Sequence, residues 1–171
     1  MKNLVKIMLL FSINCFIITA ANAQGNPEPT AKQIKAAAKE AAIKTAVENQ
    51  SYIFKADYVL PMRGMQRYLT SDYDLRVVKD SVIAFLPYFG QVFMNAPMNP
   101  EEAGINFTST KFDYICQVRK KGGWSVTIMP KNDKYTTKMI LDIYTNGNAT
   151  LNVNSNYRDP ITFTGYVKIM E

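Results

Sequence analysis

The sequence predicts a mainly β protein: an antiparallel meander that closes into a barrel of roughly eight strands, preceded by one N-terminal α-helix. Apolar and polar residues alternate with a period of two over much of residues 52–169, as in strands with one buried face. Turn residues separate the alternating runs. Consecutive antiparallel strands of this kind favour closure, because a closed sheet leaves no unpaired edge.

Residues 1–23 are typical of a cleaved secretory signal peptide. Lys2 and Lys6 form the positive start, residues 7–18 are mostly apolar, and Ala21-Asn22-Ala23 is a small-x-small cleavage site. The pattern predicts cleavage between Ala23 and Gln24 and export to the periplasm. The apolar run is shorter than the about 20 residues that span a bilayer, so we expect no membrane-spanning anchor.

The rest of the chain fits one domain, with a flexible leader and a helix in residues 24–50 and the barrel in residues 51–171. Thr30, with Gln33 three residues later, has the spacing of a capping box before an Ala- and Lys-rich run. Ile34 and Ile43 fall on opposite sides of this helix. We therefore expect the helix to dock only loosely on the barrel.

The strands follow in order along the chain. In the first, Tyr52, Phe54, Ala56, Tyr58 and Leu60 share one face, and Pro61 ends it. We expect a loop at residues 95–104 and turns at Lys121-Gly122-Gly123, Asn146-Gly147 and residues 156–160. The other alternating runs predict strands near residues 75–77, 82–86, 112–118, 124–128, 135–144, 149–153 and 161–169.

The absence of histidine is the strongest chemical constraint. It excludes Ser-His-Asp and Cys-His triads and the usual zinc sites, all of which need an imidazole. We therefore predict no catalytic residues, no metal site and no cofactor, although Glu101 and Glu102 could hold calcium weakly. The formal net charge of +6 falls by two when Lys2 and Lys6 are removed, which is too small to indicate nucleic acid as a partner.

Neither of the two cysteines is expected to be lipid-modified or catalytic. Asn14 before Cys15 and apolar sequence after it disfavour a lipid-modified cysteine. Signal cleavage leaves Cys116 as the one cysteine, on the apolar face of a predicted strand, where a thiol is usually a small buried hydrophobe.

Asp72 and Asp74 fall on the polar face of another strand, where we expect contact with solvent.

Several motifs resemble a family of exported proteins from Bacteroidetes-type bacteria, called domain of unknown function 4251. The matching segments are Asp74 to Arg76, Asp80-Ser81-Val82, Leu86-Pro87-Tyr88-Phe89-Gly90, Gly104-Ile105-Asn106-Phe107 and Lys120-Lys121-Gly122-Gly123. The resemblance implies a calycin or lipocalin-type barrel, and with it, by analogy of fold, lipid binding. Such an analogy does not establish a function.

The first functional hypothesis is that the barrel binds an apolar or amphipathic small molecule, such as a lipid, in its interior. It requires an interior cavity larger than a few waters. The candidate lining residues are Phe54, Tyr58, Tyr114, Trp124, Ile128, Met139 and Leu141, with Tyr88 and Phe89 near the mouth.

Two readings compete with this hypothesis. The ordinary structural role of Tyr88, Phe89 and Phe93 is a plug that fills one barrel end. A filled barrel would instead act as a protein- or glycan-interaction module through loops such as Met94 to Glu102. Arg63 and Arg67 could pair with a ligand carboxylate or phosphate, but they also fit as solvated loop charges. The sequence does not identify any particular protein partner.

Overall fold

The computed structural model of the chain describes residues 28–93 and 104–170. The predicted signal peptide, the segment Met94 to Glu102 with Glu101 and Glu102, and all of the predicted loop 95–104 except Gly104 lie outside these residues. The chain divides into two compact units, Met1–Ile34 and Lys35–Glu171. In the first, Thr30 N–H donates to Gln33 Oε1 at 2.8 Å and Gln33 N–H to Thr30 Oγ1 at 3.4 Å, which confirms the capping box at the start of helix α2, Ala31–Glu48.

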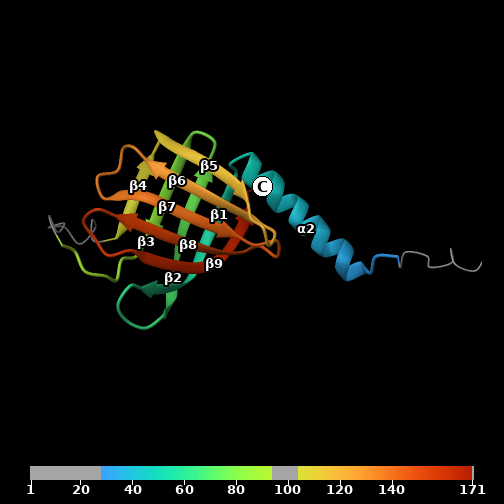
Figure 1. Cartoon of the computed structure of the whole chain (residues 1–171), viewed down its shortest axis with the longest axis horizontal. Coiled ribbons are helices and arrows are strands. Elements are labelled where there is room, and N and C mark those ends of the chain that lie inside the picture. Colours follow the sequence, from blue (N-terminus) through green and yellow to red (C-terminus); the bar gives the residue numbers. More distant parts are fainter. Residues whose placement is uncertain (1–27, 94–103, 171) are drawn as a thin grey trace, which may run out of the picture. The chain divides into compact units, whose positions relative to one another are not determined.

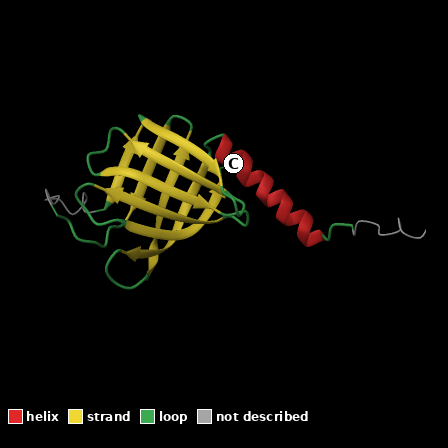
Figure 2. Ribbon diagram, viewed as in Figure 1, coloured by secondary structure: helices red, strands yellow, loops and turns green. Residues whose placement is uncertain are grey.

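The second unit is a nearly closed antiparallel barrel of nine strands (Figure 1, Figure 2). The strands lie side by side in the order β4-β3-β2-β1-β9-β8-β7-β6-β5. The predicted fold class is confirmed, with β4 as an additional strand. The strands are β1 Tyr52–Pro61, β2 Arg67–Val78, β3 Ser81–Leu86, β4 Ile105–Ser109, β5 Phe112–Val118, β6 Trp124–Pro130, β7 Thr136–Ile143, β8 Asn148–Ser155 and β9 Ile161–Ile169.

Alternate side chains of these strands form one hydrophobic core. In β6, for example, Trp124, Val126 and Ile128 are buried while Ser125 and Thr127 between them are partly exposed. The predicted hairpin turns are also present, since Gly122, Gly123 and Gly147 have φ of +85°, +83° and +87°, which other residues adopt only with strain. No helix in the described part of the chain is long and apolar enough to cross a membrane.

A β-bulge in β1 changes which side chains face inward. Ala56 pairs with Gly165 of β9 and Tyr58 pairs with the preceding residue, Thr164, so Asp57 is the extra residue. Beyond the bulge Val59 and Pro61 are buried, whereas Tyr58 is 42 % exposed and Leu60 is also exposed. The prediction that Tyr58 and Leu60 share the inner face was therefore wrong, because one inserted residue inverts the alternation.

β5 and β4 are the two end strands of the sheet, and each is paired on one side only in the described part of the chain. Along β5 the burial decreases from Phe112 to Val118, and Cys116 is exposed. The prediction of a buried cysteine was wrong. A sequence pattern alternates in the same way in a central strand and in an edge strand, although the latter has a neighbour on one side only.

The C-terminal part of α2 belongs to the core. Ile43, Ala46 and Val47 are buried within the same cluster as the strands. The expectation of a loosely docked helix was therefore wrong for this part, because the spacing of three and four between these residues places them on one helical face. The Tyr114 hydroxyl, on β5, donates to the Val47 carbonyl at 3.0 Å, which ties this helix end to the barrel.

Candidate functional site

The predicted interior lining is packed solid. Phe54, Ile128, Met139 and Leu141 have no accessible surface, and Trp124 retains only 6 %. A side chain with no accessible surface touches no space that can hold a water molecule, inside or outside the barrel. The expectation that these residues surround an interior cavity was therefore wrong, since large apolar side chains from both sides of the barrel fill its centre.

Tyr58 and Tyr114 are also placed away from any interior cavity. Tyr58 packs on Tyr68 on the outer face, with ring centroids 5.3 Å apart. The hydroxyl of Tyr114 lies 3.3 Å from that of Tyr52, and since Tyr114 donates to Val47, Tyr52 donates to Tyr114. Burial raises the pKa of Tyr52 well above its ordinary value and that of Tyr114 to about 12. Tyr114 thus acts in folding and leaves no free hydroxyl proton for a ligand.

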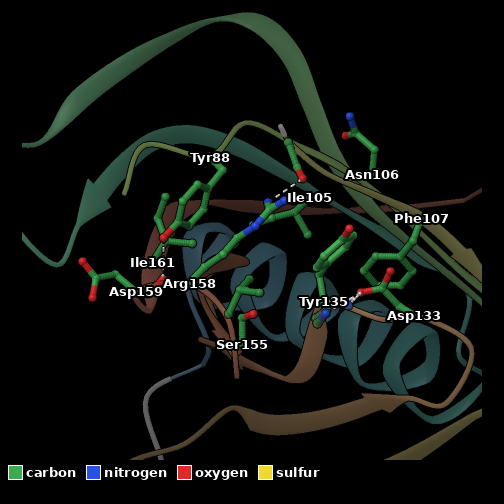
Figure 3. Close-up of a pocket in the computed structure, with 13 residues that line it drawn as sticks. Tyr88, Ile105, Asn106, Phe107, Asp133, Tyr135, Ser155, Arg158, Asp159 and Ile161 are labelled. Atoms are coloured by element: carbon green, nitrogen blue, oxygen red, sulfur yellow. Dashed lines mark hydrogen bonds between the residues drawn. The ribbon is translucent and has the colours of Figure 1, made fainter. Parts of the chain in front are cut away.

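A pocket of about 100 Å³ opens at one end of the barrel, and it is the best candidate site (Figure 3). Its walls come from the loop after β3, the start of β4, the β6–β7 loop and the β8–β9 region. Of the predicted lining residues, it contains Tyr88 alone. The pocket is lined by Tyr88, Gly104, Ile105, Asn106, Phe107, Asp133, Tyr135, Thr136, Val153, Ser155, Arg158, Asp159 and Ile161.

Arg158 is the central cation of this mouth pocket and is only 4 % exposed. Its Nη1 donates to the Gly104 carbonyl at 2.9 Å, and its guanidinium lies between two aromatic rings, 5.0 Å from the Tyr88 centroid and 5.1 Å from the Tyr135 centroid (Figure 3). Cation–π contacts of this kind stabilise a desolvated guanidinium. Sequence analysis missed Arg158, because a single arginine in a turn carries no spacing that distinguishes it from a solvated charge.

Backbone pairing holds this arginine in place. An isolated bridge joins Val92 to Arg158, with Phe93 N–H donating to the Tyr157 carbonyl at 2.8 Å and Asp159 N–H to the Gln91 carbonyl at 3.0 Å. The Tyr88 hydroxyl lies 2.9 Å from the Gln91 carbonyl and 3.1 Å from that of Asp159. Burial is the main cause of the raised pKa of Tyr88. The segment after β3 is therefore fastened to the β8–β9 loop.

An open groove lies beside the mouth pocket and shares Tyr88 and Asp159 with it. Arg63 and Arg67, from the β1–β2 hairpin, line this groove together with Phe89. Tyr88 and Phe89 are thus the two predicted site residues that the structure brings together at the barrel mouth. The groove is lined by Pro61, Arg63, Arg67, Tyr88, Phe89, Gly90, Gln91 and Asp159.

The carboxylates of the described residues show no grouping that could hold a metal ion. No group of three potential ligands occurs in residues 28–93 and 104–170. Asp133 accepts the backbone N–H groups of Tyr135 and Thr136. Asp74, which we expected to meet solvent, is buried, with Lys55 at 3.0 Å and Arg76 at 3.2 Å. Cationic neighbours on the same sheet face cover it, a contact that alternation alone does not reveal.

Comparison with solved structures supports the fold. The chain is similar to the crystal structure of a DUF4251 family protein from Bacteroides eggerthii, with a TM-score of 0.57 and 17 % identity over 78 % of this chain and 89 % of that chain. No curated protein matches this chain. The model of the family described as domain of unknown function (DUF4251) matches residues 34–167, that is most of α2 and the barrel up to Val167 in β9. The chain therefore belongs to the DUF4251 family.

Proposed function

We propose that this protein is an exported barrel that binds a small apolar or amphipathic molecule at its mouth, in the periplasm. The observation that carries this proposal is the mouth pocket, where apolar walls surround a desolvated guanidinium between two tyrosines. Ligand sites are typically concave and mostly apolar, with a few well-placed polar groups. Ile105, Val153 and Ile161 supply the apolar wall.

The size of the pocket limits the ligand. A volume of about 100 Å³ is smaller than the cavity of about 150 Å³ that takes up benzene in an engineered protein. It therefore accepts a short acyl end or part of a small ring, and the rest of any larger molecule must lie outside. Burial of this group would supply about 25 cal/mol per Å² of apolar surface, before the cost of immobilising the ligand.

A pocket-filling substitution tests the proposal. The protein would be purified gently from its own cells and examined by native mass spectrometry for a bound molecule, with hexanol titrated by NMR as a simple neutral probe. Ser155→Leu should fill the pocket and abolish hexanol binding, whereas Ser125→Leu, at a partly exposed position of β6 outside both hollows, should leave it unchanged. The absence of both a bound molecule and hexanol binding in the unaltered protein would refute the proposal.

A second candidate function is an interaction module, and one observation favours it. The β1–β2 hairpin exposes Tyr58, Leu60, Met62, Met65 and Tyr68, and clustered apolar side chains of this kind are typical of protein interfaces. A photo-crosslinking residue at position 65 in cells should then capture one discrete protein, and the same residue at Lys138 should not. Loss of that adduct in a Tyr58→Ser, Tyr68→Ser variant would tie the capture to the hairpin.

A further inference from the structure

We propose that the ligand of the barrel mouth is an amphipathic anion, whose carboxylate or phosphate monoester is held by Arg63 and Arg67 in the groove beside the pocket. This inference rests on the proposed function, because it assigns the polar half of the same ligand. The apolar half occupies the mouth pocket, and the charged half lies in the groove.

The two arginines are oriented by neutral partners. Arg63 Nη1 donates to Gln91 Oε1 at 3.2 Å, and the Arg67 guanidinium carbon lies 5.3 Å from the Phe89 ring centroid. Neither forms an ion pair with a carboxylate in the described residues, where the ion pairs involve other cations. Both side chains are therefore held in place, while no carboxylate of the described residues compensates their positive charge.

The balance of charge in the groove favours an anion. Among the described residues, Asp159 is the one acidic residue that lines the groove, and its side chain is largely buried. Two guanidinium groups face one carboxylate, so a bound anion gains net attraction. Each guanidinium presents a planar fork of donors that matches carboxylate and phosphate oxygens, which a lysine ammonium does not.

The position of Tyr88 connects the groove to the pocket. This side chain lines both hollows, and its hydroxyl is fastened to the Gln91 and Asp159 carbonyls. A ligand with a short apolar end in the pocket would pass Tyr88 and place its next polar group beside the arginines. The ring can contact the hydrocarbon at this crossing while the arginines bind the charge.

A matched set of four probes tests the inference by NMR titration of the purified protein: hexanol, hexanoate, hexyl phosphate and hexylammonium. The two anions should bind about fivefold to tenfold more tightly than hexanol, and hexylammonium more weakly. Added salt should reduce this preference, because the groove is open to solvent. The tighter of the two anions identifies the headgroup.

Two double variants separate a local effect from one of net charge. Arg63→Gln with Arg67→Gln should bring the anions to within about twofold of hexanol without weakening hexanol. Lys120→Gln with Lys121→Gln removes the same charge from a hairpin turn outside both hollows and should keep the preference. Binding of neither anion more tightly than hexanol in the unaltered protein would overturn the inference and leave the proposed function standing. Binding of inorganic phosphate alone, with no hexyl compound bound, would overturn the proposed function and with it the amphipathic ligand.

Discussion

At the scale of single residues, a short chain of hydrogen bonds links the helix to the barrel. Tyr52 on β1 donates to Tyr114 on β5, and Tyr114 donates to the carbonyl of Val47 in the last turn of α2. The last carbonyls of a helix have no partner within the helix, so a side-chain donor there satisfies an otherwise unpaired group. Tyr52 is fully buried, which makes loss of its acceptor costly.

Tyr114→Phe should therefore destabilise the protein by about 1–2 kcal/mol, because it removes the donor to Val47 and leaves the buried Tyr52 hydroxyl without its acceptor. The measurement is urea unfolding followed by fluorescence or circular dichroism. Tyr166→Phe, on an exposed ring, should change the free energy of unfolding by no more than about 0.5 kcal/mol. Equal effects of the two substitutions would show that the hydrogen bonds contribute nothing specific.

The same pair predicts a loss of stability in alkaline solution. Burial raises the pKa of Tyr52 and Tyr114 above the ordinary tyrosine value of about 10. Between the ordinary and the raised pKa the folded state holds more protons than the unfolded state, so stability falls as the pH rises through that range. The urea midpoint should drop between about pH 9 and pH 11.5 more steeply than in a Tyr52→Phe, Tyr114→Phe variant. Parallel pH profiles would contradict this.

At the scale of elements, alternation predicted the barrel, and its failures have identifiable physical causes. A period of two identifies the buried faces of regular strands such as β6 and β8. A period of two does not reveal the extra residue Asp57, which turns Tyr58 outward. It also does not reveal that β5 is an edge strand, which exposes Cys116. Of the residues at the barrel mouth, the sequence indicated Tyr88 and Phe89 and raised Arg63 and Arg67 as possible partners of a ligand anion. Arg158 and the wall of β4 were not predictable, because pairing between distant segments brings them there.

The bulge in β1 requires a residue without a side chain at position 165 of the partner strand β9. A Cβ atom on Gly165 would collide with the carbonyl oxygen of Lys55, which is backbone and cannot rotate away. Gly165→Ala should therefore force β1 and β9 apart and cost about 1–3 kcal/mol. Thermal or urea unfolding would measure this, with Lys168→Ala on the exposed side of β9 as the control. A loss no larger than that of the control would mean that the bulge shifts freely.

At the scale of the whole molecule, the barrel is closed at its sides by strand pairing everywhere except between its two end strands. β9 is paired on both sides, with β1 and β8, whereas β5 is paired in the described structure with β6 alone. About half of the amides of β5 therefore point away from the ladder. This is also where the exposed side chains of Ile115 and Val118 lie.

Native-state hydrogen exchange should reveal this seam directly. Amides of β9 from Ile161 to Tyr166 should exchange only through global unfolding, because each of these ladder positions has a neighbour on both sides. Alternate amides of β5, from Tyr114 to Val118, should exchange orders of magnitude faster, since no strand in the described part of the chain pairs with that edge. NMR exchange measured residue by residue distinguishes the two groups within one sample, so no variant is needed as a control. Uniform protection along β5 would show instead that its outer edge is paired in solution, by a second copy of the chain or by a segment outside the described residues.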